Sequence, residues 1–244
     1  SMPLDAAVQE TKKLAQEGYR EIVVNGIEIS SWGWEWKNGS KLPELLSAIC
    51  QAAPAVRIRL GSLEPRTIDE DFCKALSVFP NLCPQFHLSL QSGCDTVLKR
   101  MNRKYDTARY LESVHLLRRY FPGCAVTTDL IVGFPGETEQ EFSASLSFLQ
   151  TCELSAVHVF PYSRRKGTPA ASMPDQVEKA EKERRSARAG EIAAQLHHTF
   201  LTHQLGTEHD VLFEQTEKGC FTGHTMNYVK VYCDAKDLRN EIRR

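Results

Sequence analysis

Five loops of this chain combine glycines with polar side chains, and each follows a strand-like segment directly. One of them, VGFPGET, places two glycines and a proline within four residues, although glycine is costly to order and proline removes a hydrogen-bond donor. Thr138 and Glu141 form a capping-box pattern for a following helix, which leaves Gly133 and Gly136 without a local reason. Such loops favour a site for a large polar ligand over simple turns. Their sequences are NGIEISSWG, GSLEP, LQSG, VGFPGET and PYSRRKGTP.

The side chains of these loops are suited to polar recognition. Gln91 and Ser92 offer uncharged hydrogen-bonding groups for a ribose or an amide. Arg57 and Arg59 alternate with apolar residues in RIRLGSLEP, where a buried arginine is costly unless it is paired. We therefore expect Glu64 or a ligand carboxylate to pair with them.

Charged and turn residues complete the set of candidates. Asn25 and Gly26 stand where a strand meets its loop. Asp129 lies within a strand, and Glu137 stands at the start of a helix. A turn is the alternative reading of each position taken alone.

The chemistry-bearing motifs of several common enzyme classes are absent. GxGxxG and GxxxxGKS do not occur, which removes support for dinucleotide and nucleoside triphosphate sites, and neither GxSxG nor HExxH is present. The eight cysteines are spaced by ten residues or more and form no CxxC or CxxxCxxC. We expect them to be small buried hydrophobic residues in a reducing cytosol, and we expect no metal site.

Strand-like and helical segments alternate along the first two thirds of the chain, at the spacing of βαβ units. This alternation predicts an α/β fold with a parallel sheet covered by helices. Polar loops after every strand favour a partial β/α barrel over a doubly wound sheet, since a barrel gathers its site at the carboxyl ends of its strands. The five expected strands lie in residues 20–26, 56–65, 85–93, 125–134 and 156–163.

The remaining third has a different character. Residues 176–204 predict one long charged helix, and short alternating strands with glycine turns follow from near Gly206. We expect a partial barrel over 3–175, a connecting helix over 176–205 and a small, truncated all-β region over 206–244. The net charge is −1, and no apolar run approaches the roughly 18 residues that would span a bilayer, so no membrane association is expected.

Two further features are compatible with a nucleic acid. Trp32, Trp34 and Trp36 are spaced by two, which predicts one side of an extended loop that stacks on a nucleobase or packs against another domain. Arg164 and Arg165 follow the last barrel strand, where they could contact phosphates, although a solvated charged run is the usual reading.

Three segments resemble the radical-SAM methylthiotransferases across roughly 200 residues of the chain. They are FHLSLQSGCDTVLKRMNRKY, TTDLIVGFPGETEQEF and HVFPYSRRKGTPAASMPDQV. The resemblance implies a partial radical-SAM barrel that binds S-adenosyl-L-methionine and a 4Fe–4S cluster, followed by a TRAM-like RNA-binding β domain. It also implies methylthio transfer to tRNA through a deoxyadenosyl radical, with an electron donor as a further partner.

By the same resemblance, particular residues surround adenosylmethionine. The glycines of the VGFPGET loop would let the protein backbone approach adenosylmethionine. Phe160 would lie beside the adenine, and Asn25 with Gly26 would lie near the methionine amino group. Arg164, Arg165 and, in the β region, Lys230 would contact RNA. The implied cofactor-binding set is Asn25, Gly26, Arg59, Gln91, Ser92, Asp129, Gly133, Gly136, Glu137 and Phe160. No catalytic acid or base is assigned.

RIRLGSLEP resembles the branch that modifies threonylcarbamoyladenosine beside the tRNA anticodon. The branches that act on isopentenyladenosine or on a ribosomal protein are the alternatives. The family's CxxxCxxC is missing here, so we expect a fragment of a longer cytoplasmic enzyme that is inactive alone. A non-catalytic tRNA-binding module and a phosphate-binding barrel isomerase or aldolase are the rival hypotheses.

Overall fold

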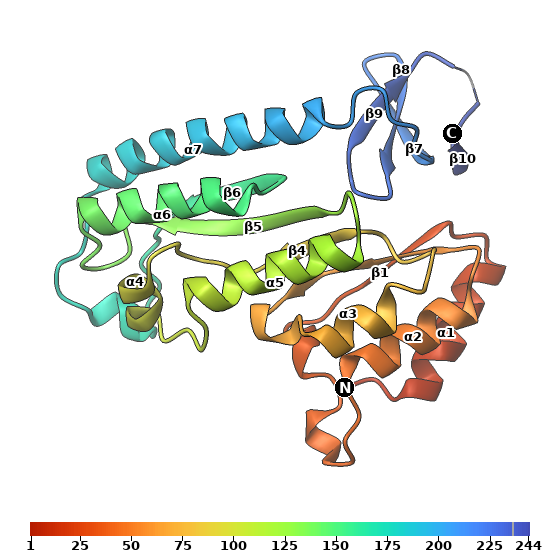
Figure 1. Cartoon of the computed structure of the whole chain (residues 1–244), viewed down its shortest axis with the longest axis horizontal. Helices are drawn as coiled ribbons and strands as arrows, with labels where there is room; N and C mark the ends of the chain where they lie inside the picture. The colour runs from red at the N-terminus through yellow and green to blue at the C-terminus, as the bar shows by residue number, and fades with distance from the viewer. Residues whose placement is uncertain (236) are drawn as a thin grey trace. The chain divides into compact units, whose positions relative to one another are not determined.

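The computed structural model describes residues 1–235 and 237–244 and shows an α/β protein (Figure 1). Its helices are α1 (Leu4–Gln16), α2 (Leu42–Ala52), α3 (Glu70–Leu76), α4 (Asp95–Arg100), α5 (Thr107–Tyr120), α6 (Glu139–Cys152) and α7 (Lys179–Thr202). Its strands are β1 (Glu21–Val24), β2 (Arg57–Leu60), β3 (Ser62–Leu63), β4 (Gln85–Leu88), β5 (Ala125–Val132), β6 (Ala156–Pro161), β7 (Val211–Glu217), β8 (Cys220–Thr225), β9 (Lys230–Cys233) and β10 (Glu241–Arg243). The five strands expected in the first two thirds are confirmed as β1, β2, β4, β5 and β6.

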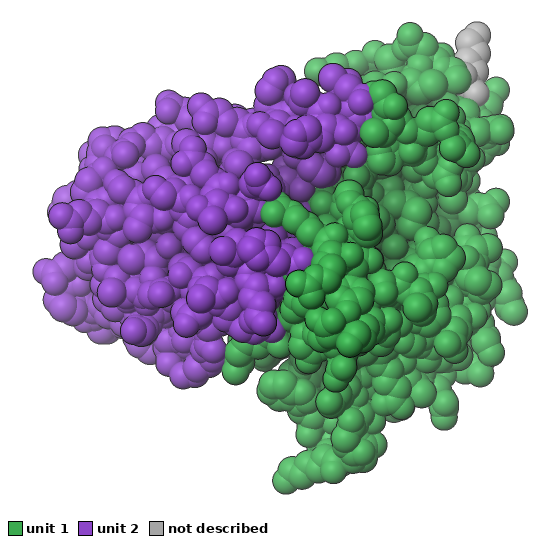
Figure 2. All heavy atoms as spheres, in the orientation of Figure 1, with its two compact units in different colours: residues 1–87, 116–125, 206–244 green, residues 88–115, 126–205 purple. Residues whose placement is uncertain are grey.

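The chain divides into two compact units, coloured separately in Figure 2. Unit 1 comprises residues 1–87, 116–125 and 206–244, and unit 2 comprises residues 88–115 and 126–205. Each unit therefore gathers segments that are far apart in the sequence.

Unit 1 contains a parallel pair of strands and an antiparallel sheet. β1 pairs with β2 so that Glu21 lies opposite Arg57 and Val24 opposite Leu60. Helix α1 packs on α2, and α2 on α3, which buries apolar side chains such as Leu46 and Phe72. The antiparallel sheet has the order β10-β7-β8-β9 and confirms the β character expected after Gly206.

Unit 2 is built around the parallel pair β5 and β6. Their register runs from Thr127 opposite Ala156 to Val132 opposite Pro161. Helix α7 packs on both β6 and α6, and in Figure 1 it runs alongside them. The long helix expected over residues 176–204 is thus confirmed, and its role is to cover β6.

The tryptophan loop differs from the sequence prediction. Instead of an extended segment, it forms two short 3-10 helices, Ile29–Ser31 and Trp34–Trp36, because Gly33 and Lys37 turn the chain with φ of 83° and 52°. The rings of Trp32 and Trp36 meet edge to face with centroids 5.0 Å apart, whereas Trp34 is 64% exposed. The three rings therefore do not form one stacking surface.

The cysteines behave as expected where they are buried. Five are buried and three are partly exposed, and all eight are free thiols. Burial raises the pKa of Cys50 to about 11 and that of Cys73 to about 12, so these thiols stay protonated.

No helix among the described residues combines the length and apolar character needed to cross a membrane.

Helix α6 begins with the capping box expected from the sequence. The Thr138 hydroxyl accepts from the Glu141 amide, and the Glu141 carboxylate accepts from the Thr138 amide. The same carboxylate accepts two hydrogen bonds from Arg100, at 2.8 and 2.7 Å. The Arg100 guanidinium holds the pKa of Glu141 at about 2.

We predict that Glu141→Gln lowers the free energy of unfolding at pH 7 by about 1–2 kcal/mol, because glutamine keeps the cap but loses the charge opposite Arg100. The depressed pKa means that this stabilisation is present above the unfolded-state pKa and is lost as the pH falls from about 5 towards 2. Urea titrations across that range should show wild type and variant converging. A constant difference down to pH 2 would contradict the assignment, and Glu112→Gln, at an exposed pair with Arg109, is the control.

Candidate functional site

The loop after β5 is locked by a buried carboxylate. Oε2 of Glu137 accepts a hydrogen bond from the Gly133 amide at 2.5 Å and another from Arg185 Nη1 at 2.8 Å. The side chains of Glu137 and Arg185 are 2% and 6% exposed. Burial raises the pKa of Glu137, while the Gly133 amide and Arg185 act in the opposite direction. The loop is therefore closed by its own fifth residue, with its charge balanced from α7.

The Arg185 guanidinium also forms hydrogen bonds with the backbone of the same loop and with a residue of its own helix. Nη1 also donates to the Glu137 backbone carbonyl at 2.9 Å, and Nε donates to Glu181 at 2.7 Å. The planar fork of arginine allows both contacts at once. Sequence reasoning missed this pairing, because Arg185 lies in a run of charged residues that no local pattern distinguishes from one another.

Gly133 adopts φ of 71°, a left-handed conformation that favours glycine. A Cβ placed on Gly133 would lie 2.3 Å from Cγ of Lys182. Lys182 in turn donates from Nζ to the Tyr162 carbonyl at 3.1 Å. Within this structure, the space beside Gly133 is thus filled by the stem of Lys182.

The amides of this loop are used internally. Gly136 donates to the Asp175 carbonyl at 2.8 Å, and Glu137 donates to the Phe134 carbonyl at 2.9 Å. Gly133 donates to the Glu137 carboxylate. A phosphate-cradling loop needs several amides that point at one anion. This arrangement lacks that feature, which removes support for a phosphate-binding barrel.

Some groups around the loop remain available. A Cβ on Gly136 would meet nothing closer than Arg100 Nε at 3.8 Å. Among the described residues, Arg100 Nε and Tyr162 Oη are buried without a hydrogen-bond partner. Phe160, at the carboxyl end of β6, is 50% exposed. An open glycine, two unpaired polar atoms and an exposed ring therefore occur in one unit.

Gln91 and Ser92 are placed differently from one another. The Gln91 backbone bridges β5, donating to the Asp129 carbonyl at 3.0 Å and accepting from Ile131 at 2.9 Å, and its φ is 67°. Ser92 is fully buried and its hydroxyl lies 3.2 Å from that of Ser145 in α6. Asp129 is partly buried within β5. Ser92 therefore contacts helix α6 rather than solvent.

In unit 1, Asn25 and Gly26 lie exposed at the end of β1. The Asn25 carboxamide oxygen accepts from the Gly26 amide at 2.9 Å, and a Cβ on Gly61 would lie only 2.3 Å from it. A side chain at position 61 would therefore displace the Asn25 carboxamide, a contact that sequence reasoning missed. Gly26 has no close neighbour, the nearest being Ile29 at 3.7 Å. Packing among the described residues therefore does not require glycine at position 26.

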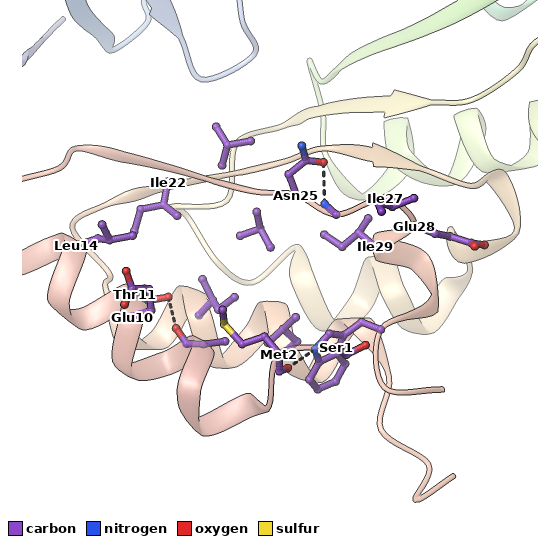
Figure 3. A pocket seen from close by; sticks show the side chains of 17 residues that line it. Ser1, Met2, Glu10, Thr11, Leu14, Ile22, Asn25, Ile27, Glu28 and Ile29 are labelled. Atoms are coloured by element: carbon purple, nitrogen blue, oxygen red, sulfur yellow. Dashed lines mark hydrogen bonds between the residues drawn. The ribbon is translucent and has the colours of Figure 1, made fainter. Parts of the chain in front are cut away.

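A cavity of about 550 Å³ lies beside β1 and α1 in unit 1. Its lining is mainly apolar and includes Leu14, Ile22 and Ile29, and Asn25 is among its polar residues (Figure 3). Two of the predicted site residues, Asn25 and Gly26, line this cavity.

The prediction that Glu64 pairs with Arg57 and Arg59 was wrong. Arg59 forms a bidentate pair with Glu21, at 2.7 and 2.9 Å, whereas Glu64 pairs with Arg66. Parallel pairing of β1 with β2 brings Glu21 within reach, and Glu64 lies beyond the end of β2. Burial lowers the pKa of Arg59, but the hydrogen bonds to Glu21 and the charge interactions with Cys83, Glu21 and Tyr228 together outweigh this effect and raise the pKa.

Arg57 and Arg59 also hold the C-terminal sheet. Arg57 donates to the carbonyls of Asp210 at 2.7 Å and His224 at 3.0 Å. Arg59 donates to the Met226 carbonyl at 3.0 Å, and its guanidinium lies 4.6 Å from the centre of the Tyr228 ring. Both arginines are 4% exposed. In this structure they join β2 to the segments around β7 and β8.

The three predicted RNA contacts are all exposed. Arg164 donates from Nε to the Ala171 carbonyl, and Lys230 pairs with Glu217 and lies 5.1 Å from the centre of the Tyr232 ring. Arg165 lies in the loop after β6. Their exposure is compatible with phosphate contacts.

Comparison with sequence families gives one match. The profile described as "Radical SAM superfamily" matches residues 1–149. Among curated proteins, the chain is 38% identical over 94% of its length to threonylcarbamoyladenosine tRNA methylthiotransferase MtaB of Thermotoga maritima, and covers 53% of that protein. It is 37% identical over 86% of its length to tRNA-2-methylthio-N(6)-dimethylallyladenosine synthase of Clostridium botulinum strain Langeland, and covers 46% of it.

Solved structures share the fold at lower identity. Coproporphyrinogen III oxidase (HemN) from Escherichia coli, a radical SAM enzyme, aligns with a TM-score of 0.58 and 16% identity, over 96% of this chain and 54% of that one. TsrM from Kitasatospora setae, solved with cobalamin and a [4Fe-4S] cluster, aligns with a TM-score of 0.57 and 18% identity, over 70% of this chain and 33% of that one. The chain spans about half the length of the curated relatives it matches.

We predict that Gly133→Ala lowers the free energy of unfolding by about 1–3 kcal/mol, because alanine is strained at this φ and would collide with Lys182. Gly190, inside α7, has no positive φ, and a Cβ added there would meet no neighbour within 4 Å. Gly190→Ala should therefore stabilise the chain by about 0.5–1 kcal/mol. Thermal unfolding of both variants checks the pair, and equal shifts of the same sign would contradict the packing described.

We predict that Arg59→Met lowers the free energy of unfolding by about 3–5 kcal/mol, because it leaves Glu21 largely buried without its partner. Arg66→Met breaks the exposed pair with Glu64 and should cost about 0–1 kcal/mol. Urea titrations of the two variants at pH 7 make the comparison. Similar small losses for both would show that Arg59 does not join these strands as described.

Proposed function

Because the chain belongs to the Radical SAM superfamily, we propose that it forms part of a tRNA methylthiotransferase. The observation that carries the proposal is the 38% identity to a curated tRNA methylthiotransferase, which extends over 94% of this chain. The resemblance of its motifs to the radical-SAM methylthiotransferases is confirmed by these relatives. The superfamily implies S-adenosyl-L-methionine and a 4Fe–4S cluster as the cofactors.

S-adenosyl-L-methionine fits the groups that unit 2 leaves available. The exposed ring of Phe160 can stack on an adenine, and Gly136 leaves room for close approach to the backbone. Tyr162 Oη supplies an unpaired hydrogen-bonding group. When bound, adenosylmethionine supplies the radical-forming chemistry of the superfamily. The residues of this chain would bind and orient it and exclude water, and none is assigned as an acid or base.

In unit 1, Gly26 is compatible with a contact with the same cofactor. Packing does not require glycine at position 26, and the neighbouring Asn25 is exposed. Arg59 and Ser92 are withdrawn from this role in the proposal, because both are buried against other protein groups. Asn25 and Gly26 are proposed as adenosylmethionine contacts by resemblance alone. The contacts proposed from this structure lie within unit 2 and are Gln91, Asp129, Phe160 and the loop from Gly133 to Glu137.

A 4Fe–4S cluster does not fit the donors of this chain. Among the described residues, no group of three or more His, Cys, Asp or Glu could hold a metal ion. Buried thiols such as Cys83, whose pKa burial raises to about 12, are poor ligands because the thiolate is the binding form. We therefore propose that residues outside these 244 hold the cluster, and that this chain alone is inactive.

We propose that the substrate is the modified nucleoside threonylcarbamoyladenosine, next to the anticodon of a tRNA. The RIRLGSLEP segment and the curated relatives from Thermotoga maritima and Bacillus subtilis support it. The arginines of that segment are buried in unit 1, so they support the choice by resemblance and not by contact with RNA. The dimethylallyladenosine relative, at 37% identity, makes isopentenyladenosine the second candidate.

The RNA contacts that we propose are Arg164, Arg165 and Lys230, which are exposed cations. An electron donor would serve the complete enzyme. Eight free cysteines support a reducing, cytoplasmic compartment.

We predict that the complete protein containing this chain adds a methylthio group to threonylcarbamoyladenosine in tRNA. The complete protein is reconstituted anaerobically with iron, sulfide and a reductant and is then incubated with adenosylmethionine and tRNA. The masses of the tRNA nucleosides are measured afterwards. A matched reaction with isopentenyladenosine-containing tRNA distinguishes the two substrates. Unchanged nucleosides in both reactions would contradict the enzymatic proposal, and salt-sensitive tRNA binding without modification would favour a non-catalytic binding module.

A further inference from the structure

Helix α7 lies outside the alternating strands and helices, yet three of its contacts converge on one loop. Arg185 binds Glu137 through both its carboxylate and its backbone carbonyl. Lys182, one helical turn before Arg185, fills the space beside Gly133 and reaches the Tyr162 carbonyl. The loop after β5 and the end of β6 are thus both fixed by the same helix face.

The charge arrangement explains why the helix is needed. The Glu137 carboxylate accepts the hydrogen bond from the Gly133 amide. A charged carboxylate that is buried this deeply is costly unless a cation pairs with it. Arg185 provides the cation. Without it, Glu137 would take up a proton or turn towards solvent, and Gly133 would lose the group that fixes its left-handed conformation.

We propose that Arg185 and Lys182 are positioning residues for adenosylmethionine: they fix the Gly133–Glu137 loop and the end of β6 in the form that accepts the cofactor. This inference rests on the proposed function. Neither side chain is assigned a contact with the ligand, and their effect is exerted through Glu137, Gly133 and the Tyr162 carbonyl.

The neighbouring Arg184 provides a matched control. It lies on the same helix and pairs with Glu139 and Glu181, but it is 49% exposed and does not touch the loop. Removing its charge leaves both contacts of Arg185 with Glu137 in place, although Glu181, which also accepts from Arg185, loses one of its two arginine partners.

Calorimetric titration of the 244-residue chain with S-adenosyl-L-methionine tests the inference, at a temperature where circular dichroism shows every variant folded. Arg185→Met and Glu137→Gln should each weaken binding tenfold or more, and Arg184→Met should leave the dissociation constant within twofold of wild type. Arg185→Lys, which keeps the charge, should recover part of the loss. The double variant Glu137→Gln/Arg185→Met should bind no more weakly than either single variant, since both act on one pair.

The possible outcomes distinguish the positioning role of Arg185 from the proposed binding of adenosylmethionine. If wild type binds and Arg185→Met binds equally well, the positioning role is overturned while the proposed function stands. A double variant whose loss is the product of the two single losses would also overturn it. If wild type does not bind adenosylmethionine, the proposed ligand is contradicted and this inference falls with it.

Discussion

A single buried ion pair determines the shape of the loop that the sequence marks most clearly. Glu137 and Arg185 are almost fully withdrawn from solvent, and one carboxylate oxygen of Glu137 serves both Arg185 and the Gly133 amide. A buried pair of this kind contributes little net stability, but removing one partner costs several kcal/mol. Its contacts are with the turn between β5 and α6, where it joins the Gly133 amide and the Glu137 carbonyl to α7.

The two glycines of this loop then have different explanations. Gly133 is required by its φ and by the stem of Lys182, so its reason lies inside the protein. Gly136 also has a positive φ, of 73°, but the space around it is open. A Cβ at Gly136 would meet no atom closer than Arg100 Nε, which is buried without a hydrogen-bond partner among the described residues. Both glycines thus have a left-handed φ, but only Gly133 is also enclosed by a neighbouring side chain.

Local patterns in the sequence were sufficient for the elements and for one helix cap. The β-branched segments predicted β1, β2, β4, β5 and β6, and Thr138 with Glu141 predicted the capping box of α6. Those signals act over a few residues. The tryptophan spacing failed because Gly33 and Lys37 turn the chain into 3-10 helices, which a period of two does not reveal.

The two buried ion pairs join residues that are far apart in the sequence, and local patterns do not reveal them. Glu137 and Arg185 are 48 positions apart, and Arg59 and Glu21 are 38 apart. Nothing in the local pattern distinguishes Arg185 from the exposed Arg184 beside it, or Glu21 from the nearer Glu64. Only the packing of α7 on β6 and α6 and the register of β1 with β2 select these partners.

The most direct test of this account is the hydrogen-exchange rate of the Gly133 amide, measured by NMR on the wild-type chain and on Arg185→Met. If Glu137 holds this amide under the control of Arg185, Gly133 should be strongly protected in wild type and should lose that protection in the variant. The Phe142 amide inside α6, bonded to the Thr138 carbonyl, should stay protected in both. Exchange of Gly133 at the rate of an unfolded chain in wild type, or unchanged protection in the variant, would contradict the account.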